Sequence, residues 1–128
     1  IDTFVIIVIC AGDVNGDGLA DFMQSNSNTG FGAVIFGDAT PGSSINMMTL
    51  TGTDGFQIAR PSPAFTPGVH DITGANFVGD GKNDVFVSYY DSGIQAGGIA
   101  VILGSTPLFS STVTITSAGI TGADGFLI

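Results

Sequence analysis

Four oxygen-bearing side chains alternate along the sequence DVNGDGLAD near the start of the chain. Asp13, Asn15, Asp17 and Asp21 occupy positions 1, 3, 5 and 9 of this stretch, and a glycine occupies position 6. Side chains at alternate positions of a tight loop can converge on one point, and glycine permits the sharp turn. Ca²⁺ takes about six to eight oxygen ligands, including backbone carbonyls. The spacing therefore predicts a Ca²⁺ site formed by these four side chains and the carbonyl oxygen of Leu19 at position 7.

Two other structures are compatible with this loop. Asn-Gly and Asp-Gly pairs often form turns in which the side chain accepts hydrogen bonds from its own backbone, without a metal. An EF-hand would need a bidentate Glu at position 12 and flanking helices, whereas position 12 here is Gln24. Three carboxylates without a basic neighbour repel one another unless a cation lies between them. That repulsion favours the metal site over the simple turn.

A second loop, NFVGDGKND, follows the same plan with fewer ligands. It retains Asp80 and Asp84 at positions 5 and 9, but has Asn76 at position 1, Val78 at position 3 and Lys82 at position 7. Valine offers no side-chain oxygen, and the number of carboxylates falls. The second loop is therefore expected to bind Ca²⁺ more weakly than the first, or not at all.

The two loops belong to an internal repeat. Three blocks recur in the same order, with an offset that grows along the chain: AGDVNGDGLADF with GANFVGDGKNDVF, GAVIFGD with GIAVILGS, and TGTDGFQI with TGADGFLI. Conserved strands with surface loops of variable length produce this pattern. Each copy is about the size of one four-stranded propeller blade.

Short runs of Val, Ile, Phe, Tyr and Thr, separated by Gly, Asn, Asp, Ser and Pro, predict antiparallel strands. All eleven acidic residues are aspartates, which favour turns over helices. The sole cysteine, Cys10, has apolar neighbours and is expected in the core. The predicted strands are Phe4 to Ile9, Phe22 onward, Ala33 to Phe36, Asn46 to Leu50, Phe56 to Ile58, Val85 to Tyr89, Ile99 to Leu103 and Val113 to Thr116.

The motif DVNGDGLAD, followed by GAVIFGD and TGTDGF, resembles the FG-GAP repeat of integrin α-subunit propellers and related bacterial surface proteins. The resemblance covers nearly the whole chain, twice. It implies a four-stranded blade that holds Ca²⁺ in the loop between its first two strands. The ligands that it implies are Asp13, Asn15, Asp17, the Leu19 carbonyl and Asp21 in the first copy, and Asn76, Asp80, the Lys82 carbonyl and Asp84 in a weaker second site.

The expected fold is all-β, with two four-stranded antiparallel β-propeller-type blades. Residues 1–59 would form the first blade with the intact calcium loop, and residues 60–73 the connection and the first strand of the second blade. Residues 74–128 would form the second blade with the degenerate loop. The proline-rich segment Arg60 to Pro67 reads as the connection between the copies.

The amino-acid composition makes some classes of binding partner unfavourable. With Arg60 and Lys82 as the only basic residues, the formal net charge of -9 would repel nucleic acid and anionic membrane surfaces. The apolar run Phe4 to Cys10 is far shorter than the roughly 20 residues of a membrane-spanning helix. The sequence begins without an initiator Met or a charged n-region, which suits a mature secreted form or an excised piece. Neither nucleic-acid binding nor membrane insertion is expected.

No catalytic constellation is recognisable. His70 beside Asp71 lacks a nucleophile in a strained elbow, so we expect no enzyme activity within these residues. The function expected is an extracellular or cell-surface, calcium-binding module for adhesion or scaffolding, with a protein or carbohydrate ligand.

Two alternatives remain open: a self-assembling subunit of an extracellular filament, and the non-catalytic propeller part of a larger secreted enzyme. Repeat units below about three rarely stand alone, so copies of this chain, or further blades of a larger propeller, are expected as partners.

Overall fold

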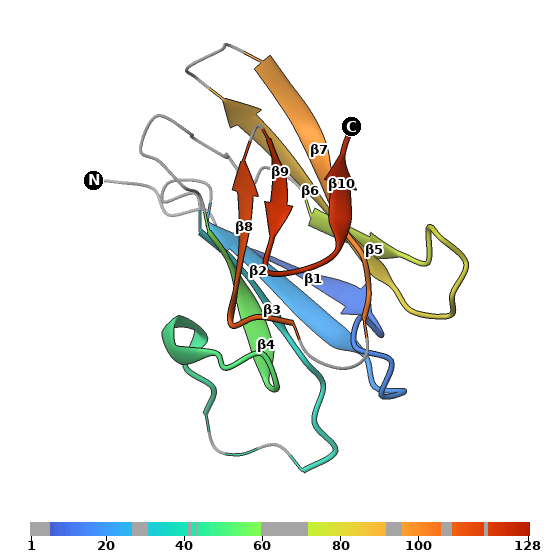
Figure 1. Ribbon diagram of the computed structural model, residues 1–128. Coiled ribbons are helices and arrows are strands. Elements are labelled where there is room, and N and C mark those ends of the chain that lie inside the picture. Colours follow the sequence, from blue (N-terminus) through green and yellow to red (C-terminus); the bar gives the residue numbers. More distant parts are fainter. Residues whose placement is uncertain are drawn as a thin grey trace.

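The computed structural model describes residues 6–26, 31–40, 42, 44–59, 72–91, 96–105, 109–116 and 118–128. These residues form ten strands and one 3₁₀ turn (Figure 1), so the expectation of an all-β fold is confirmed. No helix among them is long and apolar enough to cross a membrane. The elements are β1 (Ile6–Gly12), β2 (Asp21–Asn26), β3 (Phe31–Ile35), η1 (Met47–Thr49), β4 (Gly55–Ala59), β5 (Ile72–Ala75), β6 (Asp84–Asp91), β7 (Ala96–Ile102), β8 (Thr112–Thr116), β9 (Gly119–Thr121) and β10 (Gly125–Leu127).

The strands form two sheets. The first sheet has six strands in the order β1-β2-β3-β4-β8-β9, and the second has four in the order β10-β7-β6-β5. Strands β1 to β4 pair antiparallel in sequence order, as do β5, β6, β7 and β10. We expected four strands in each sheet, but the first sheet has six. The β8–β9 hairpin comes from the second repeat and joins the first sheet, where β8 pairs in parallel with β4.

The internal repeat is present in the strand register. In the first sheet Val34 lies between Met23 and Phe56 on neighbouring strands. In the second sheet Val101 lies between Phe86 and Phe126 in the same way, and these three residues are the repeat equivalents of the first three. The two repeats therefore build the same four-stranded antiparallel unit. We call the face that carries this row the front face of each sheet, and the opposite side the back face.

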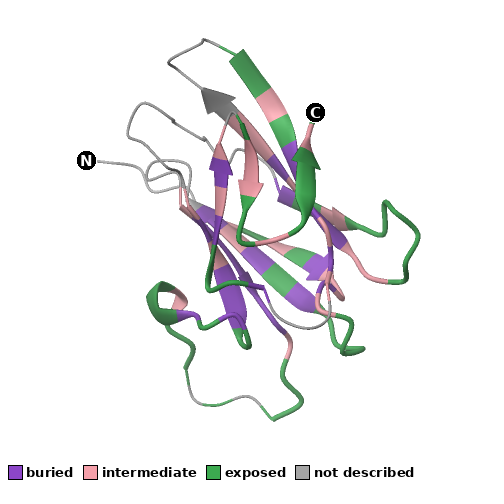
Figure 2. Cartoon of the chain, viewed as in Figure 1, coloured by how far each residue is buried: buried purple, intermediate pink, exposed green. Residues whose placement is uncertain are grey.

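The core lies between the front face of the first sheet and the back face of the second sheet. Side chains alternate along a strand, so Val34 and Phe56 from the first sheet and Val85, Val87 and Ile102 from the second face one another in a single buried cluster. Figure 2 shows the buried stretches concentrated along these strands. A smaller cluster, formed by Ala33, Ile35 and Leu50, lies on the back face of the first sheet.

The long segment between β7 and β10 contributes to this core. Phe109, which precedes β8, stacks on Phe56 at a ring-centroid distance of 4.5 Å, and both rings contact Phe36. Near the other end of the sheets β1 approaches β5 closely, since a methyl group at Gly74 would overlap the backbone carbonyl of Ala11. The segment that follows β7 thus packs on the first sheet through these rings, and the two sheets also meet directly where β1 approaches β5.

Three local expectations differ from the structure or fall outside the described residues. The strand predicted at Asn46 to Leu50 is wrong: Met47–Thr49 is a 3₁₀ turn, capped by the Asn46 side chain, which accepts the Met48 N–H at 3.0 Å. Cys10 is exposed rather than buried, because it lies opposite Phe22 on the back face of the first sheet. The connection Arg60 to Pro67, together with Phe4 and His70, lies outside the described residues.

The Phe56 ring is predicted to contribute strongly to stability, because it is buried between residues of both sheets. Phe56→Ala should lower the free energy of unfolding by about 3–5 kcal/mol. Urea denaturation followed by circular dichroism measures this loss. The control is Met48→Ala at an exposed position in η1, which should change stability by less than about 0.5 kcal/mol. Equal effects of the two substitutions would contradict this core assignment.

Candidate functional site

The first loop, between β1 and β2, is organised around Asp13. The Asp13 Oδ1 accepts the N–H groups of Gly16 at 2.7 Å and Asp17 at 3.0 Å, and its Oδ2 accepts that of Gly18 at 2.9 Å. Gly16 and Gly18 have φ angles of 79° and 85°, in the left-handed region that favours glycine. One carboxylate thus closes the loop on itself, which only a sequence with glycines at these positions allows without strain.

The next two predicted ligands lie in the same loop and contact each other. Asn15 donates from Nδ2 to Asp17 Oδ2 at 2.9 Å, and its Oδ1 accepts the Asp17 N–H at 3.1 Å. The Leu19 N–H donates to Asp17 Oδ1 at 2.7 Å. Both Asp17 and Leu19 are exposed. The loop therefore presents Asn15 and Asp17 together, on a solvent-accessible surface.

Asp21, the fourth predicted side-chain ligand, is buried at the start of β2. Its Oδ2 accepts the Val14 N–H at 2.6 Å, and its Oδ1 accepts the Gly37 N–H at 2.8 Å. Burial raises the pKa of this carboxyl group, and the negative charge of Asp17 raises it further, while the N–H groups of Gly37 and Val14 oppose the shift. The carboxylates of Asp17 and Asp21 are therefore close enough to repel each other. Asp21 also ties the first loop to the segment that follows β3.

The second loop, between β5 and β6, has a different electrostatic balance. The Lys82 Nζ forms an ion pair with Asp80 Oδ2 at 3.1 Å, and the Lys82 N–H donates to Asp80 Oδ1 at 3.0 Å. These two hydrogen bonds lower the pKa of Asp80. Asn76 accepts the Gly79 N–H at 2.9 Å. The side-chain ammonium group of Lys82 therefore supplies the positive charge that a bound cation would supply in the first loop.

Asp84 repeats the role of Asp21 in the second sheet. Its Oδ2 accepts the N–H groups of Phe77 at 2.8 Å and Val78 at 3.2 Å, and its Oδ1 accepts that of Gly104 at 2.9 Å. Gly37 and Gly104 are repeat equivalents, and a methyl group at either would crowd the neighbouring backbone. Each repeat thus contains one buried aspartate that joins its loop to the end of its third strand. Sequence reasoning assigned both aspartates to metal binding and missed this second role. The only sequence signal for this role was the glycine that recurs after the third strand of each repeat, in Gly37-Asp38 and Gly104-Ser105.

The first loop is also hydrogen-bonded to the second sheet. The Asp13 carbonyl accepts the Asn83 N–H at 2.7 Å, and the Val14 carbonyl accepts the Ser105 N–H at 3.1 Å. A side chain at Gly12 would overlap that of Asn83. Figure 1 shows the two loops at the same end of the molecule. The loop with the predicted metal ligands is therefore part of the contact between the sheets.

The donors present in the first loop are those that Ca²⁺ prefers, namely carboxylate, amide and carbonyl oxygens. Within the described part of the chain, no three His, Cys, Asp or Glu side chains form a group that could hold a metal ion. The carboxylates instead point at backbone N–H groups. A carboxylate offers about four acceptor positions, so one that accepts two N–H bonds still has lone pairs for a cation. The donor set fits Ca²⁺, and the Asx turns that the loop forms keep its ligands within one short stretch.

Comparison with known proteins provides no relative for this chain. No family model matches it, no curated protein matches it, and no solved structure matches it.

The two buried aspartates are predicted to stabilise the fold independently of any metal. Asp84→Ala would leave the Val78 and Gly104 N–H groups without an acceptor, while the Phe77 N–H would keep the Ala75 carbonyl. Asp21→Ala would likewise leave two N–H groups without an acceptor. One of the two groups in each case, the Gly104 or the Val14 N–H, takes part in a buried hydrogen bond. At about 1–3 kcal/mol for a buried unsatisfied group, either substitution should cost at least that much stability. Thermal denaturation in excess chelator measures the effect without contribution from Ca²⁺.

The matched control is Asp38→Ala, since Asp38 is exposed and the hydrogen bonds that it accepts from described residues come from nearby Thr40. It should change stability by less than about 0.5 kcal/mol. Wild-type stability of Asp84→Ala in chelator would show that the carboxylate is not a structural link.

Proposed function

We propose that this chain is a non-catalytic, calcium-stabilised β-repeat module of the FG-GAP type, in which each four-stranded unit is a propeller-type blade. The observation that supports this most directly is the position of the first loop. It carries Asp13, Asn15 and Asp17, with Asp21 at the start of the next strand, and its backbone is hydrogen-bonded to the segments that flank β6 and β7. A cation held there would stabilise the loop and the contact between the sheets together.

Electrostatics favour a cation at the first loop over the second. The first loop carries three carboxylates with no described basic side chain bonded to them, within a chain of net charge -9. In the second loop Lys82 already pairs with Asp80, and Val78 replaces an oxygen ligand. A Ca²⁺ ion there would have to displace the Lys82 ammonium group, which is part of the chain and already pairs with Asp80. Binding is therefore proposed at Asp13 to Asp21, with at most weak binding at Asn76 to Asp84.

An extracellular role follows from the kind of site. Exposed loops with few carboxylates have affinities suited to the calcium concentrations outside the cell, about 10⁻⁴–10⁻³ M. A module stabilised in this way fits adhesion or scaffolding, and its ligand would be protein or carbohydrate. The net charge of -9 makes nucleic acid an unfavourable partner.

Calcium titration tests the site directly. Isothermal titration calorimetry should detect binding to the wild type that Asp17→Ala weakens at least about tenfold, because affinity depends on the charge and number of the ligands. At a calcium concentration of 100 times Kd the wild type should gain about 2.7 kcal/mol of stability. The matched control is Asp80→Ala at the equivalent position of the second loop, which should leave the tighter binding step, at the first loop, unchanged. Identical titrations for wild type and Asp17→Ala would overturn the proposal.

The link between the loop and the second sheet gives an independent readout. Ca²⁺ should slow hydrogen exchange at the amides of Asn83 and Ser105, whose acceptors are the carbonyls of Asp13 and Val14. The Gly79 amide, which donates to Asn76 within the second loop, serves as the internal control and should exchange at the same rate with and without Ca²⁺. Protection confined to residues 13–21 would show that the ion orders only its own loop.

A further inference from the structure

The front face of the second sheet carries the same row as the core of the first. In the first sheet Phe56 and Ile58 are buried beneath the second sheet, at 0% and 2% exposure. Their repeat equivalents are Phe126, at 38%, and Ile128, at 64%. These two positions are thus covered in the first repeat and exposed in the second, whereas Val101 in the middle of the row is buried, as its equivalent Val34 is.

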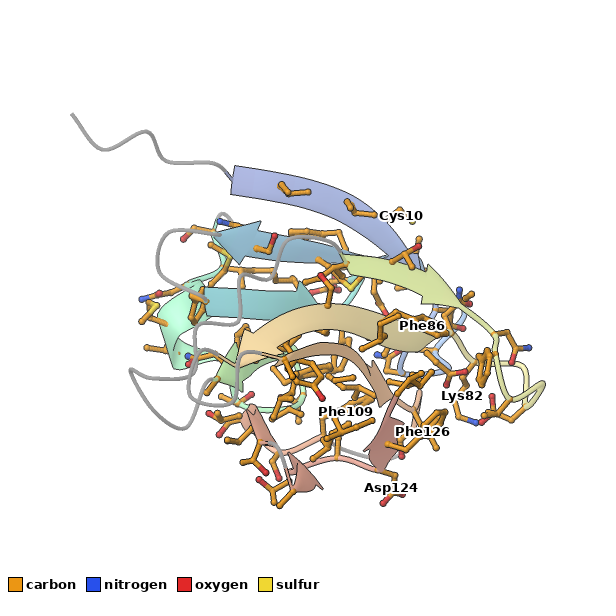
Figure 3. The ribbon with its side chains drawn as sticks, turned by 90° about the horizontal axis from the view of Figure 1, so that it is seen from above. Cys10, Lys82, Phe86, Phe109, Asp124 and Phe126 are labelled. Atoms are coloured by element: carbon orange, nitrogen blue, oxygen red, sulfur yellow. The ribbon has the colours of Figure 1, made fainter. Side chains whose placement is uncertain are left out.

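Other apolar side chains extend this exposed face. Phe77, which is 58% exposed, contacts Phe86 and Phe126 at ring-centroid distances of 5.6 and 6.2 Å. In Figure 3 Phe86 lies between Cys10 and Phe126, and Phe126 is the farther of the two rings from Cys10. A hollow of about 230 Å³ adjoins these rings and is lined by Ile72, Thr73, Phe86, Ser88 and Ile99. The face therefore offers exposed aromatic rings and, beside Phe86, a recess that would fit an aliphatic side chain.

The contact inside the chain indicates what fits such a face. The front face of the first sheet is covered by the back face of the second, so successive repeats pack front to back in one direction. By the same rule, the front face of the second sheet would take the back face of a first sheet. That surface also has exposed apolar side chains in this chain: Val8, Cys10 and Phe22 on β1 and β2.

We propose that the front face of the second sheet binds the back face of the first sheet of another copy of this chain, in a head-to-tail contact. On the back face of the first sheet, the β3 side is covered by Leu50 and Met47, which leaves β1 and β2 accessible. Inside the chain the two sheets approach closely where β1 meets β5. If two copies pack in the same way, β5 of one copy faces β1 of the next. This packing requires β1 to be accessible on the back face of the first sheet, as it is.

The internal contact also predicts the polar part of the interface. Inside the chain, the carbonyls of Asp13 and Val14 accept the N–H groups of Asn83 and Ser105. The repeat equivalents of these carbonyls are those of Asn76 and Phe77. The equivalents of the two donors are Ala20 and Asp38, and both are exposed. Between copies, the second loop of one chain would therefore bond to Ala20 and Asp38 of the next.

A contact between two different surfaces repeats from copy to copy. It closes into a ring if the rotation per copy fits, and otherwise grows into a filament. Two copies with a net charge of -9 repel each other, so assembly should strengthen as salt screens this repulsion. This assembly goes beyond the calcium-stabilised module proposed above and does not depend on it.

Paired variants test the head-to-tail contact. Phe77→Asp places a charge on the front face and Val8→Asp places one on the back face, both at exposed positions. Sedimentation velocity at increasing protein concentration should show wild-type assembly, and each variant alone should raise the concentration for half-assembly at least about tenfold, because an unpaired charge is unfavourable in an apolar contact. A control, Ala118→Asp in the β8–β9 turn, should assemble as the wild type does.

Mixing the two variants gives the decisive result. Each retains one intact surface, so an equal mixture should form a 1:1 heterodimer that does not grow further. Assembly of Val8→Asp at the wild-type concentration would indicate a symmetric contact between two front faces and overturn the proposal. A wild type that stays monomeric in calcium and high salt would also overturn it. Near-ultraviolet circular dichroism of each variant shows that loss of assembly is not loss of folding.

Discussion

A buried aspartate in each repeat is the interaction on which the rest of the structure depends. Asp21 and Asp84 each accept N–H groups from the loop that precedes their own strand and from the residue after the third strand of the same unit. A buried carboxylate is unfavourable unless it is fully hydrogen-bonded, so three segments must meet around it in one arrangement. That requirement fixes the loop, the start of the second strand and the close approach of Gly37 or Gly104 at the same time.

The sequence predicts the parts of this fold that rest on local chemistry. Strand-forming runs, the two Asp-rich loops and the repeat are all visible, because each depends on residue type and spacing alone. The parallel pairing of β8 with β4 was not predictable, since nothing near Thr112–Thr116 specifies a partner in the other repeat. The error at Met47–Thr49 has a similar origin: its apolar side chains suit a strand, but the Asn46 side chain caps a 3₁₀ turn there. The prediction that Cys10 is buried was wrong because hydrophobic neighbours do not determine which face of a strand is covered.

The candidate site shows a related limit. Asp13, Asn15 and Asp17 lie together in one loop as their spacing predicts, but spacing could not show that their oxygens accept N–H groups of that loop. Nor could it show that the Lys82 side chain pairs with Asp80, since the repeat pattern predicted a role only for the Lys82 carbonyl, as a metal ligand. Both features depend on where a flexible side chain settles after the backbone has formed. They explain why two loops with a shared pattern have different charge balances.

The difference between the loops matters because of where each one lies. The first loop is joined to the second sheet through the carbonyls of Asp13 and Val14, so its conformation and the packing of the two sheets are linked. A cation that orders this loop acts on an internal contact, whereas the Lys82–Asp80 pair keeps the second loop ordered without one. The second loop borders the exposed front face through Phe77. A cation in the first loop would therefore add to the contact inside the chain, whereas the second loop, next to the exposed aromatic face, already carries its own positive charge on Lys82.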